Sequence, residues 1–116
     1  MNEQIVKQYF ELFFSENVKY DKIRTLLADD FHFTGPLLRA NSADEYINIL
    51  KNVGAGNLSA NINSILSNEN EVAVFYNMIT PFGEVKTVEW FLFENNKIKS
   101  IELLNDPRKF LEAFSK

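Results

Sequence analysis

One carboxylate stands among aromatic residues in the stretch 84–94, EVKTVEWFLFE, and it is the strongest candidate for chemistry in the chain. The stretch alternates as a β-strand does, so Glu89 shares a face with Thr87 and Phe91. Burial there raises the pKa of a carboxyl group and lets its protonated form donate a hydrogen bond. We therefore predict an acid–base or hydrogen-bonding role for Glu89. The alternatives are a partly open face, or a structural link to a lysine or to the hydroxyl of Tyr9.

Tyr9 is the second candidate, because its spacing predicts an inward-facing ring. It lies one helical turn after Ile5 and one turn before Phe13, in a stretch from about 2 to 15 whose apolar residues recur every three or four positions. The hydroxyl of a buried tyrosine usually finds a partner within the protein. Tyr9 is therefore either a ligand contact or a core residue whose hydroxyl is satisfied internally.

His32 is the only histidine, and alternation argues against it as a catalytic base. It lies in the stretch 31–38, FHFTGPLL, on the face opposite to Phe31 and Phe33. We expect a surface or interface position for it rather than a catalytic one.

Polar residues on the neighbouring strands add to the candidate site. Asn105 shares a face with Ile101 and Leu103, where it either binds a ligand or helps the turn into the last helix. One of Tyr76 and Asn77 should face inward, and the pattern does not choose between them.

Helices are expected in the first half of the chain. After the helix at 2–15, a short one should begin at the N-cap Asp21 and end before Asp29, followed by a strand at 31–38 that Gly35 and Pro36 interrupt. Ser42 and Glu45 have the spacing of a capping box for a helix that ends at Gly54-Ala55-Gly56.

The second half is predicted to be β-structure. Strands are expected at 58–67, 72–80, 84–94 and 97–105, and Asn95-Asn96 is a typical two-residue hairpin turn. Asp106-Pro107 then caps a short final helix that carries Phe110.

This order of elements indicates an α+β fold within a single domain, 1–116. A curved, mainly antiparallel sheet with the N-terminal helices packed in its concave face would form a cone, whose interior is a natural pocket. The side chains expected to line that pocket are Phe13, Phe31, Phe33, Tyr76, Phe91, Ile101, Leu103 and Asn105.

The opposite face of the stretch 84–94 is also apolar. Val88, Trp90 and Leu92 share it, whereas a strand with one solvated face should alternate apolar with polar residues. We expect this face to be covered by a second copy of the chain, in a homodimer formed through the sheet.

Composition excludes several classes of function. The net charge is −4, the pI is about 5.0, and no basic run is present, which argues against binding nucleic acid. The absence of cysteine excludes disulfides and thiolate chemistry, and one histidine with scattered acids gives no metal-ligand spacing. We expect no cofactor, no membrane segment and no signal peptide, and hence a cytoplasmic protein.

Several strings, in this order, resemble the nuclear transport factor two-like superfamily, and within it the SnoaL-like and ketosteroid isomerase-like branch. They cover nearly the whole chain and are VKQYF at 6–10, LADDF at 27–31, EWFLF at 89–93 and KIKSI at 97–101. The resemblance implies the cone fold, and it places the oxyanion-hole tyrosine and acid of the isomerases at Tyr9 and Glu89.

The resemblance also places the general base of the isomerases, an aspartate before a proline, at Gly35 before Pro36. That base is therefore absent, and isomerase-type proton shuttling has no agent there. Two functions remain open. One is binding of a small, mostly apolar molecule, with isomerase-, cyclase- or dehydratase-like acid–base chemistry if the protein is an enzyme. The other is a non-catalytic interaction module whose pocket is filled by its own side chains.

Overall fold

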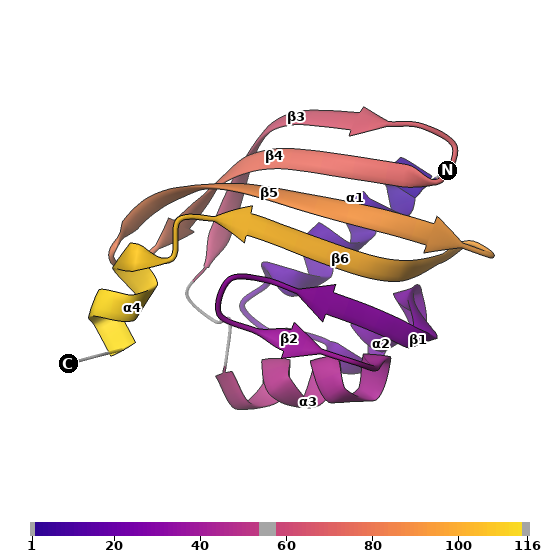
Figure 1. Cartoon of the computed structure of the whole chain (residues 1–116), viewed down its shortest axis with the longest axis horizontal. Coiled ribbons are helices and arrows are strands. Elements are labelled where there is room, and N and C mark those ends of the chain that lie inside the picture. The colour runs from indigo at the N-terminus through magenta and orange to yellow at the C-terminus, as the bar shows by residue number, and fades with distance from the viewer. Residues whose placement is uncertain (1, 54–57, 115–116) are drawn as a thin grey trace.

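The computed structural model describes residues 2–53 and 58–114, with the side chains of 113 and 114 left out, and it has the predicted α+β fold (Figure 1). A curved, unclosed six-stranded sheet has the strand order β2-β1-β6-β5-β4-β3. The elements along the chain are α1 (Asn2–Phe13), α2 (Tyr20–Leu26), β1 (Leu27–Thr34), β2 (Arg39–Ala40), α3 (Ala43–Val53), β3 (Ser59–Ser67), β4 (Glu71–Thr80), β5 (Gly83–Glu94), β6 (Lys97–Asn105) and α4 (Arg108–Phe114).

The helices form close to their predicted positions, but their ends differ: α1 ends at Phe13 rather than Ser15, and α2 ends at Leu26, so Leu27 belongs to β1. In α1 the buried residues Val6, Tyr9 and Phe10 follow the predicted stripe. The amide of Glu45 donates to Ser42 Oγ over 3.1 Å, as expected at the start of α3. Asp21 is not the N-cap of α2. The helix begins one residue earlier, at Tyr20, so Asp21 lies in the first turn, where its charge still favours the helix dipole. The predicted stop at Gly54-Ala55-Gly56 lies outside the described residues.

The first strand is displaced toward the N-terminus from its predicted position. β1 already begins at Leu27, because it pairs in parallel with β6, where Leu27 lies opposite Ile98. Gly35 ends the strand, and its amide donates to the carbonyl of Leu38 over 2.8 Å. The resulting tight turn returns the chain as β2, a two-residue strand antiparallel to β1 that the sequence analysis did not predict.

The second half forms the predicted antiparallel meander, β3 to β6. Asn95 and Asn96 both have positive φ, 53° and 61°, which is what a type I′ hairpin turn requires. Within β5 the buried residues alternate with less buried ones, so the two predicted faces of this strand are confirmed.

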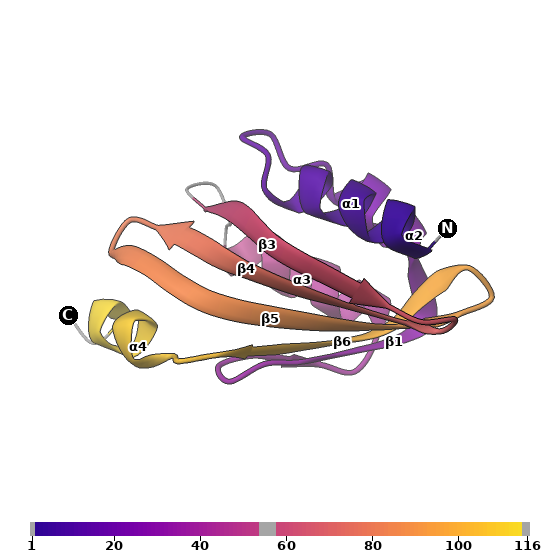
Figure 2. The same cartoon turned by 90° about the horizontal axis from the view of Figure 1, so that it is seen from above.

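The helices leave one end of the sheet's inner face less filled than the other. Figure 2 shows α1 and α2 on one side of the sheet, while α4 stands at the end where β6 finishes. The core beneath α1 and α3 is dense in aromatic rings, such as Phe91, whose ring lies 5.5 Å from that of Tyr9. At the α4 end, Phe110 packs edge-on against Phe82 at 5.1 Å. No helix in the described part of the chain is long and apolar enough to cross a membrane.

Candidate functional site

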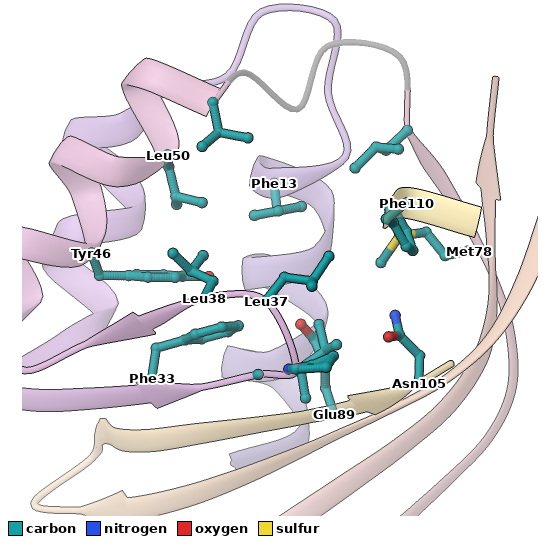
Figure 3. A pocket seen from close by; sticks show the side chains of 15 residues that line it. Phe13, Phe33, Leu37, Leu38, Tyr46, Leu50, Met78, Glu89, Asn105 and Phe110 are labelled. Atoms are coloured by element: carbon teal, nitrogen blue, oxygen red, sulfur yellow. The ribbon is translucent and has the colours of Figure 1, made fainter. Parts of the chain in front are cut away.

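A cavity of about 170 Å³ lies between the helices and the inner face of the sheet, at the end where Phe110 of α4 lines it. Figure 3 shows side chains from α1, β1, α3, β4, β5, β6 and α4 converging on it. Most of them are apolar or aromatic. The described residues that line the cavity are Phe13, Phe33, Gly35, Pro36, Leu37, Leu38, Tyr46, Leu50, Val53, Leu58, Met78, Glu89, Leu103, Asn105 and Phe110.

Glu89 is the one residue with a charged group among the described residues that line this cavity. It comes from β5, is 4% exposed, and points its carboxyl group into the cavity (Figure 3). Oε2 is buried and has no hydrogen-bond partner within the described structure. Desolvation raises the pKa of Glu89 to about 8. The carboxyl group is therefore mostly protonated at pH 7 and loses its proton slightly above it.

Asn105 supplies the second polar group. In the pairing of β6 with β5, Asn105 lies opposite Thr87, and Leu103 lies opposite Glu89. Asn105 and Glu89 are therefore diagonal neighbours on the inner face of the sheet. Oδ1 of Asn105 is also buried without a partner in the described structure. Two unpaired oxygen atoms thus belong to adjacent side chains that line one cavity.

A pair of tyrosines forms the third part of the site. The hydroxyls of Tyr9 and Tyr46 lie 2.5 Å apart, deep in the interior. Burial and the nearby Glu89 raise the pKa of both tyrosines, so both stay protonated in the physiological range. Tyr46 borders the cavity, whereas Tyr9 stands behind it. Of the two predicted alternatives for Tyr9, the structure agrees with a core residue whose hydroxyl has a partner within the protein, and that partner is Tyr46.

Sequence reasoning missed Tyr46 as a site residue, although a signal was present. Tyr46 starts the apolar stripe of α3, one position after Glu45, and its ring stacks on Phe33 at a centroid distance of 4.8 Å. A helix that follows a predicted strand and carries a tyrosine in its apolar stripe is a reason to expect a second inward hydroxyl.

Of the eight residues predicted to line the pocket, four do so: Phe13, Phe33, Leu103 and Asn105. The other four are buried elsewhere in the core. Phe31, Phe91 and Ile101 lie beneath α1 and α3, where the helices fill the sheet's inner face. Alternation fixes the face of a strand that a residue occupies, but the helices decide which part of that face stays open.

Between Tyr76 and Asn77, it is Tyr76 that faces inward. It does not border the cavity, however, because its ring packs against Phe10 at 5.1 Å and Phe14 at 6.0 Å. Its hydroxyl is buried without a partner in the described structure, and Glu89 contributes to its raised pKa. Asn77 points outward, and its Nδ2 lies 3.3 Å from Glu84 Oε2.

Gly35 has no side chain at the position where the resemblance to the isomerases places the general base. It lines the cavity, and a Cβ added there would lie 3.1 Å from Cε1 of Phe33. His32 does not replace that base. It is exposed on the other face of β1, where its Nδ1 lies 2.8 Å from the carbonyl oxygen of Asp30. Within the described residues, no cluster of His, Asp or Glu could hold a metal ion.

The outer face of the sheet carries an apolar row. Phe75 of β4, Val88 of β5 and Leu104 of β6 lie directly opposite one another across the strands. Phe75 is 38% and Leu104 52% exposed, and Trp90 beside them is 39% exposed. Val88, Trp90 and Leu92, the predicted dimer face, are thus part of a wider surface that this chain alone leaves partly uncovered.

Comparisons with known proteins show which family and which solved structures this chain resembles. The family model described as SnoaL-like domain matches residues 6–101. No curated protein shows significant similarity.

Among solved structures, an NTF2-like protein of unknown function from Cytophaga hutchinsonii is 17% identical, with 96% of this chain and 95% of that one covered and a TM-score of 0.82. A protein given as a SnoaL-like polyketide cyclase, from Jannaschia sp. CCS1, is 14% identical over 98% and 91%, with a TM-score of 0.81. TerC, co-crystallised with polyporic acid, is 14% identical over 99% and 98%, with a TM-score of 0.82.

Proposed function

Because the chain belongs to the SnoaL-like domain family, we propose that it binds a small, mostly apolar molecule in the cavity beside Glu89. The observation that carries the proposal is the buried carboxyl of Glu89, which points into an apolar cavity without a partner among the described residues. A protein interior rarely leaves such a group unpaired, since the lost hydration is not returned. A bound molecule with one polar end would restore the missing hydrogen bond.

The size of the cavity favours a molecule built on a single ring. Its volume is about 170 Å³, and an apolar protein cavity of about 150 Å³ holds benzene. The rings of Phe13, Phe33 and Phe110 come from three different elements and surround this space. A flat apolar ring would contact all three, with its polar substituent toward Glu89.

Glu89 is also the group best suited to acid–base chemistry. Its pKa of about 8 lets it donate a proton at neutral pH and take one back, and the Tyr46 hydroxyl beside the cavity can orient an oxygen or nitrogen atom. Since Gly35 supplies no second carboxylate, Glu89 would have to act as both acid and base. An isomerase-, cyclase- or dehydratase-like reaction of this kind is the enzymatic form of the proposal. The SnoaL-like polyketide cyclase and TerC, crystallised with polyporic acid, support a small-molecule function for such a fold.

A matched pair of substitutions on β6 tests binding in the cavity. Leu103 faces inward and lines the cavity, whereas Leu104 is its neighbour on the outer face. Leu103→Trp should fill the space and abolish binding of single-ring compounds, followed by ligand-observed NMR. Leu104→Trp adds the same bulk to the same strand and should leave binding unchanged. Equal affinity in the wild type and Leu103→Trp would refute the cavity as the binding site.

A second candidate function is self-association through the outer face of the sheet, and the exposed row of Phe75, Val88 and Leu104 favours it. Contiguous apolar surface of this kind is typical of interfaces, and a two-fold axis would bring the row onto its own copy. Sedimentation velocity should find a dimer that Trp90→Glu converts to a folded monomer. Glu102 lies opposite Trp90 on the same face, so the new charge would also face a like charge. A wild-type monomer at all accessible concentrations would exclude this function.

A further inference from the structure

We propose that the molecule bound in the cavity carries an amine, held as an ammonium group between Glu89 and Asn105. This inference rests on the proposed function and names the chemical class of the ligand. It follows from the kind of polar atom that the cavity offers, from the absence of a cation on its described walls, and from the aromatic rings that surround them.

When Glu89 is ionised, both unpaired atoms at the site are oxygen atoms that accept hydrogen bonds. Oε2 of Glu89 and Oδ1 of Asn105 are both buried without a partner, and their side chains lie diagonally across β5 and β6. A carbonyl oxygen on the ligand has no donor, so it would leave Asn105 Oδ1 unpaired. A hydroxyl has one donor, so it serves both side chains only while Glu89 keeps its own proton. An ammonium group has three, enough for both oxygen atoms and one further partner.

Tyr46 borders the same cavity, and its hydroxyl suits a ligand that donates hydrogen bonds. Its hydroxyl lies 2.5 Å from the Tyr9 hydroxyl, and either of the two can donate. When Tyr46 donates to Tyr9, its own oxygen keeps lone pairs that can accept from a group in the cavity. The tyrosine pair can therefore adjust to a ligand that only donates.

The charge at the site is also suited to a cation. Glu89 is the one residue with a charged group among the described residues that line the cavity, and the salt bridges in the described structure, formed by Arg24, Lys99 and Arg108, involve other acids. An ionised carboxylate enclosed by apolar walls is stabilised most by an opposite charge in direct contact. The ligand can bring that charge, because the described residues that line the cavity place none there.

The walls suit the rest of an aromatic or alicyclic amine. Tyr46 and Phe33 are stacked at 4.8 Å and both line the cavity, as do Phe13 and Phe110. A cation near such rings gains from their negative faces, and the ligand's own ring packs between them. A one-carbon link between ring and nitrogen keeps the molecule within a space of about 170 Å³.

The pH dependence follows from the titration of Glu89. Tyr9 from α1, Tyr46 from α3 and Tyr76 from β4 are the titratable neighbours coupled to it, and burial raises the pKa of all three, so they stay neutral. The pKa of Glu89 is about 8, so an ammonium group must displace a proton from it at lower pH. Affinity for the amine should rise about tenfold per pH unit below 8, level off above it, and fall again once the amine loses its own proton.

The test compares four single-ring probes that differ only in their polar end: benzylamine, benzyl alcohol, benzoate and toluene. Isothermal titration at pH 7 should show benzylamine binding about tenfold more tightly than benzyl alcohol, since hydrogen bonds between charged groups are stronger than neutral ones. Benzoate should bind most weakly.

Glu89→Gln should remove the preference for the amine and leave the affinity for benzyl alcohol within a few-fold of the wild-type value. Asn105→Leu, which keeps the side-chain size, should weaken benzylamine more than toluene.

Each outcome decides something. Equal or tighter binding of benzyl alcohol would overturn the amine and leave the cavity as the binding site. If no probe binds to the wild type, the proposed function fails together with the inference. If Glu89→Gln does not fold, the wild-type pH profiles decide: benzylamine should bind more tightly as the pH rises to 8, and more steeply so than benzyl alcohol. A flat profile for benzylamine overturns the proposal.

Discussion

The two faces of β5 differ sharply although they alternate along one strand. On the inner face, Phe91 is fully buried and Glu89 is 4% exposed, while on the outer face Trp90 between them is 39% exposed. The larger aromatic residue is therefore left partly in water, and the smaller charged one is enclosed. Burial driven by hydrophobicity alone would give the opposite arrangement.

On each face one residue has a degree of burial that does not favour the stability of the single chain: Glu89 is enclosed, and Trp90 is partly exposed. Enclosing Glu89 raises its pKa to about 8, so the fold bears a cost for keeping a carboxyl there. Leaving Trp90 exposed forgoes the gain from burying a large ring. A ligand would compensate the first and a second copy the second, which is why both faces enter the proposed function.

The largest effect should come from truncating the aromatic residue on the inner face. Phe91→Ala removes a ring that packs against Tyr9 and Phe10, and it should lower the free energy of unfolding by about 3–5 kcal/mol. Trp90→Ala, one position along, should cost no more than about 1 kcal/mol when measured on monomer, because its ring is partly solvated already. Urea unfolding at low protein concentration measures both. Similar losses for the two variants would break the comparison between the faces.

An effect of comparable size is the pH dependence that Glu89 gives to stability. Its pKa is about 8 when folded and about 4.3 in an unfolded chain, so between these values the folded state holds one more proton. Stability should therefore fall by roughly 1.4 kcal/mol per pH unit as pH rises through this window, and stay constant above pH 8.

Glu89→Gln isolates this contribution because it keeps the shape and cannot ionise. The variant should become more stable than wild type as the pH is raised from 5 to 8, with the difference growing along the way. Denaturant titrations at pH 5, 6, 7, 8 and 9 measure it. A difference that does not change with pH would mean that the carboxyl is not enclosed in solution, and the contrast between the faces would then be smaller than the structure indicates.

The alternation that separates these faces was readable from the sequence. A strand with apolar residues on both sides, ended by Asn95-Asn96, leaves little freedom in register, so the order of β3 to β6 and the inward position of Glu89 follow from local pattern. The outer row of Phe75, Val88 and Leu104 was harder to predict. It depends on how three strands are aligned, which no single strand encodes.

The position of the cavity was only half predictable for the same reason. Phe33 and Phe31 share a face of β1 and both contact Tyr46 of α3, yet only Phe33 borders the cavity, and Phe31 is fully buried in the core. Leu27 joined a strand rather than a helix because β6 offered a parallel partner. Tertiary contacts decided both cases. They also determine that the hydroxyl at the cavity belongs to Tyr46 rather than to Tyr9.

The smallest predicted effect sharpens that last distinction. Tyr9→Phe leaves the Tyr46 hydroxyl beside a cavity in which a water molecule fits, so the loss should be about 1 kcal/mol. Tyr46→Phe leaves the Tyr9 hydroxyl enclosed and away from the cavity, so the loss should lie in the upper part of about 1–3 kcal/mol. The double variant should cost less than the sum, because no hydroxyl remains to be satisfied. Urea unfolding of the three variants measures all these terms. If Tyr9→Phe is the more damaging change, then Tyr9 rather than Tyr46 presents the hydroxyl at the site, and the tyrosine from α1 would regain the contact role that its sequence position predicted.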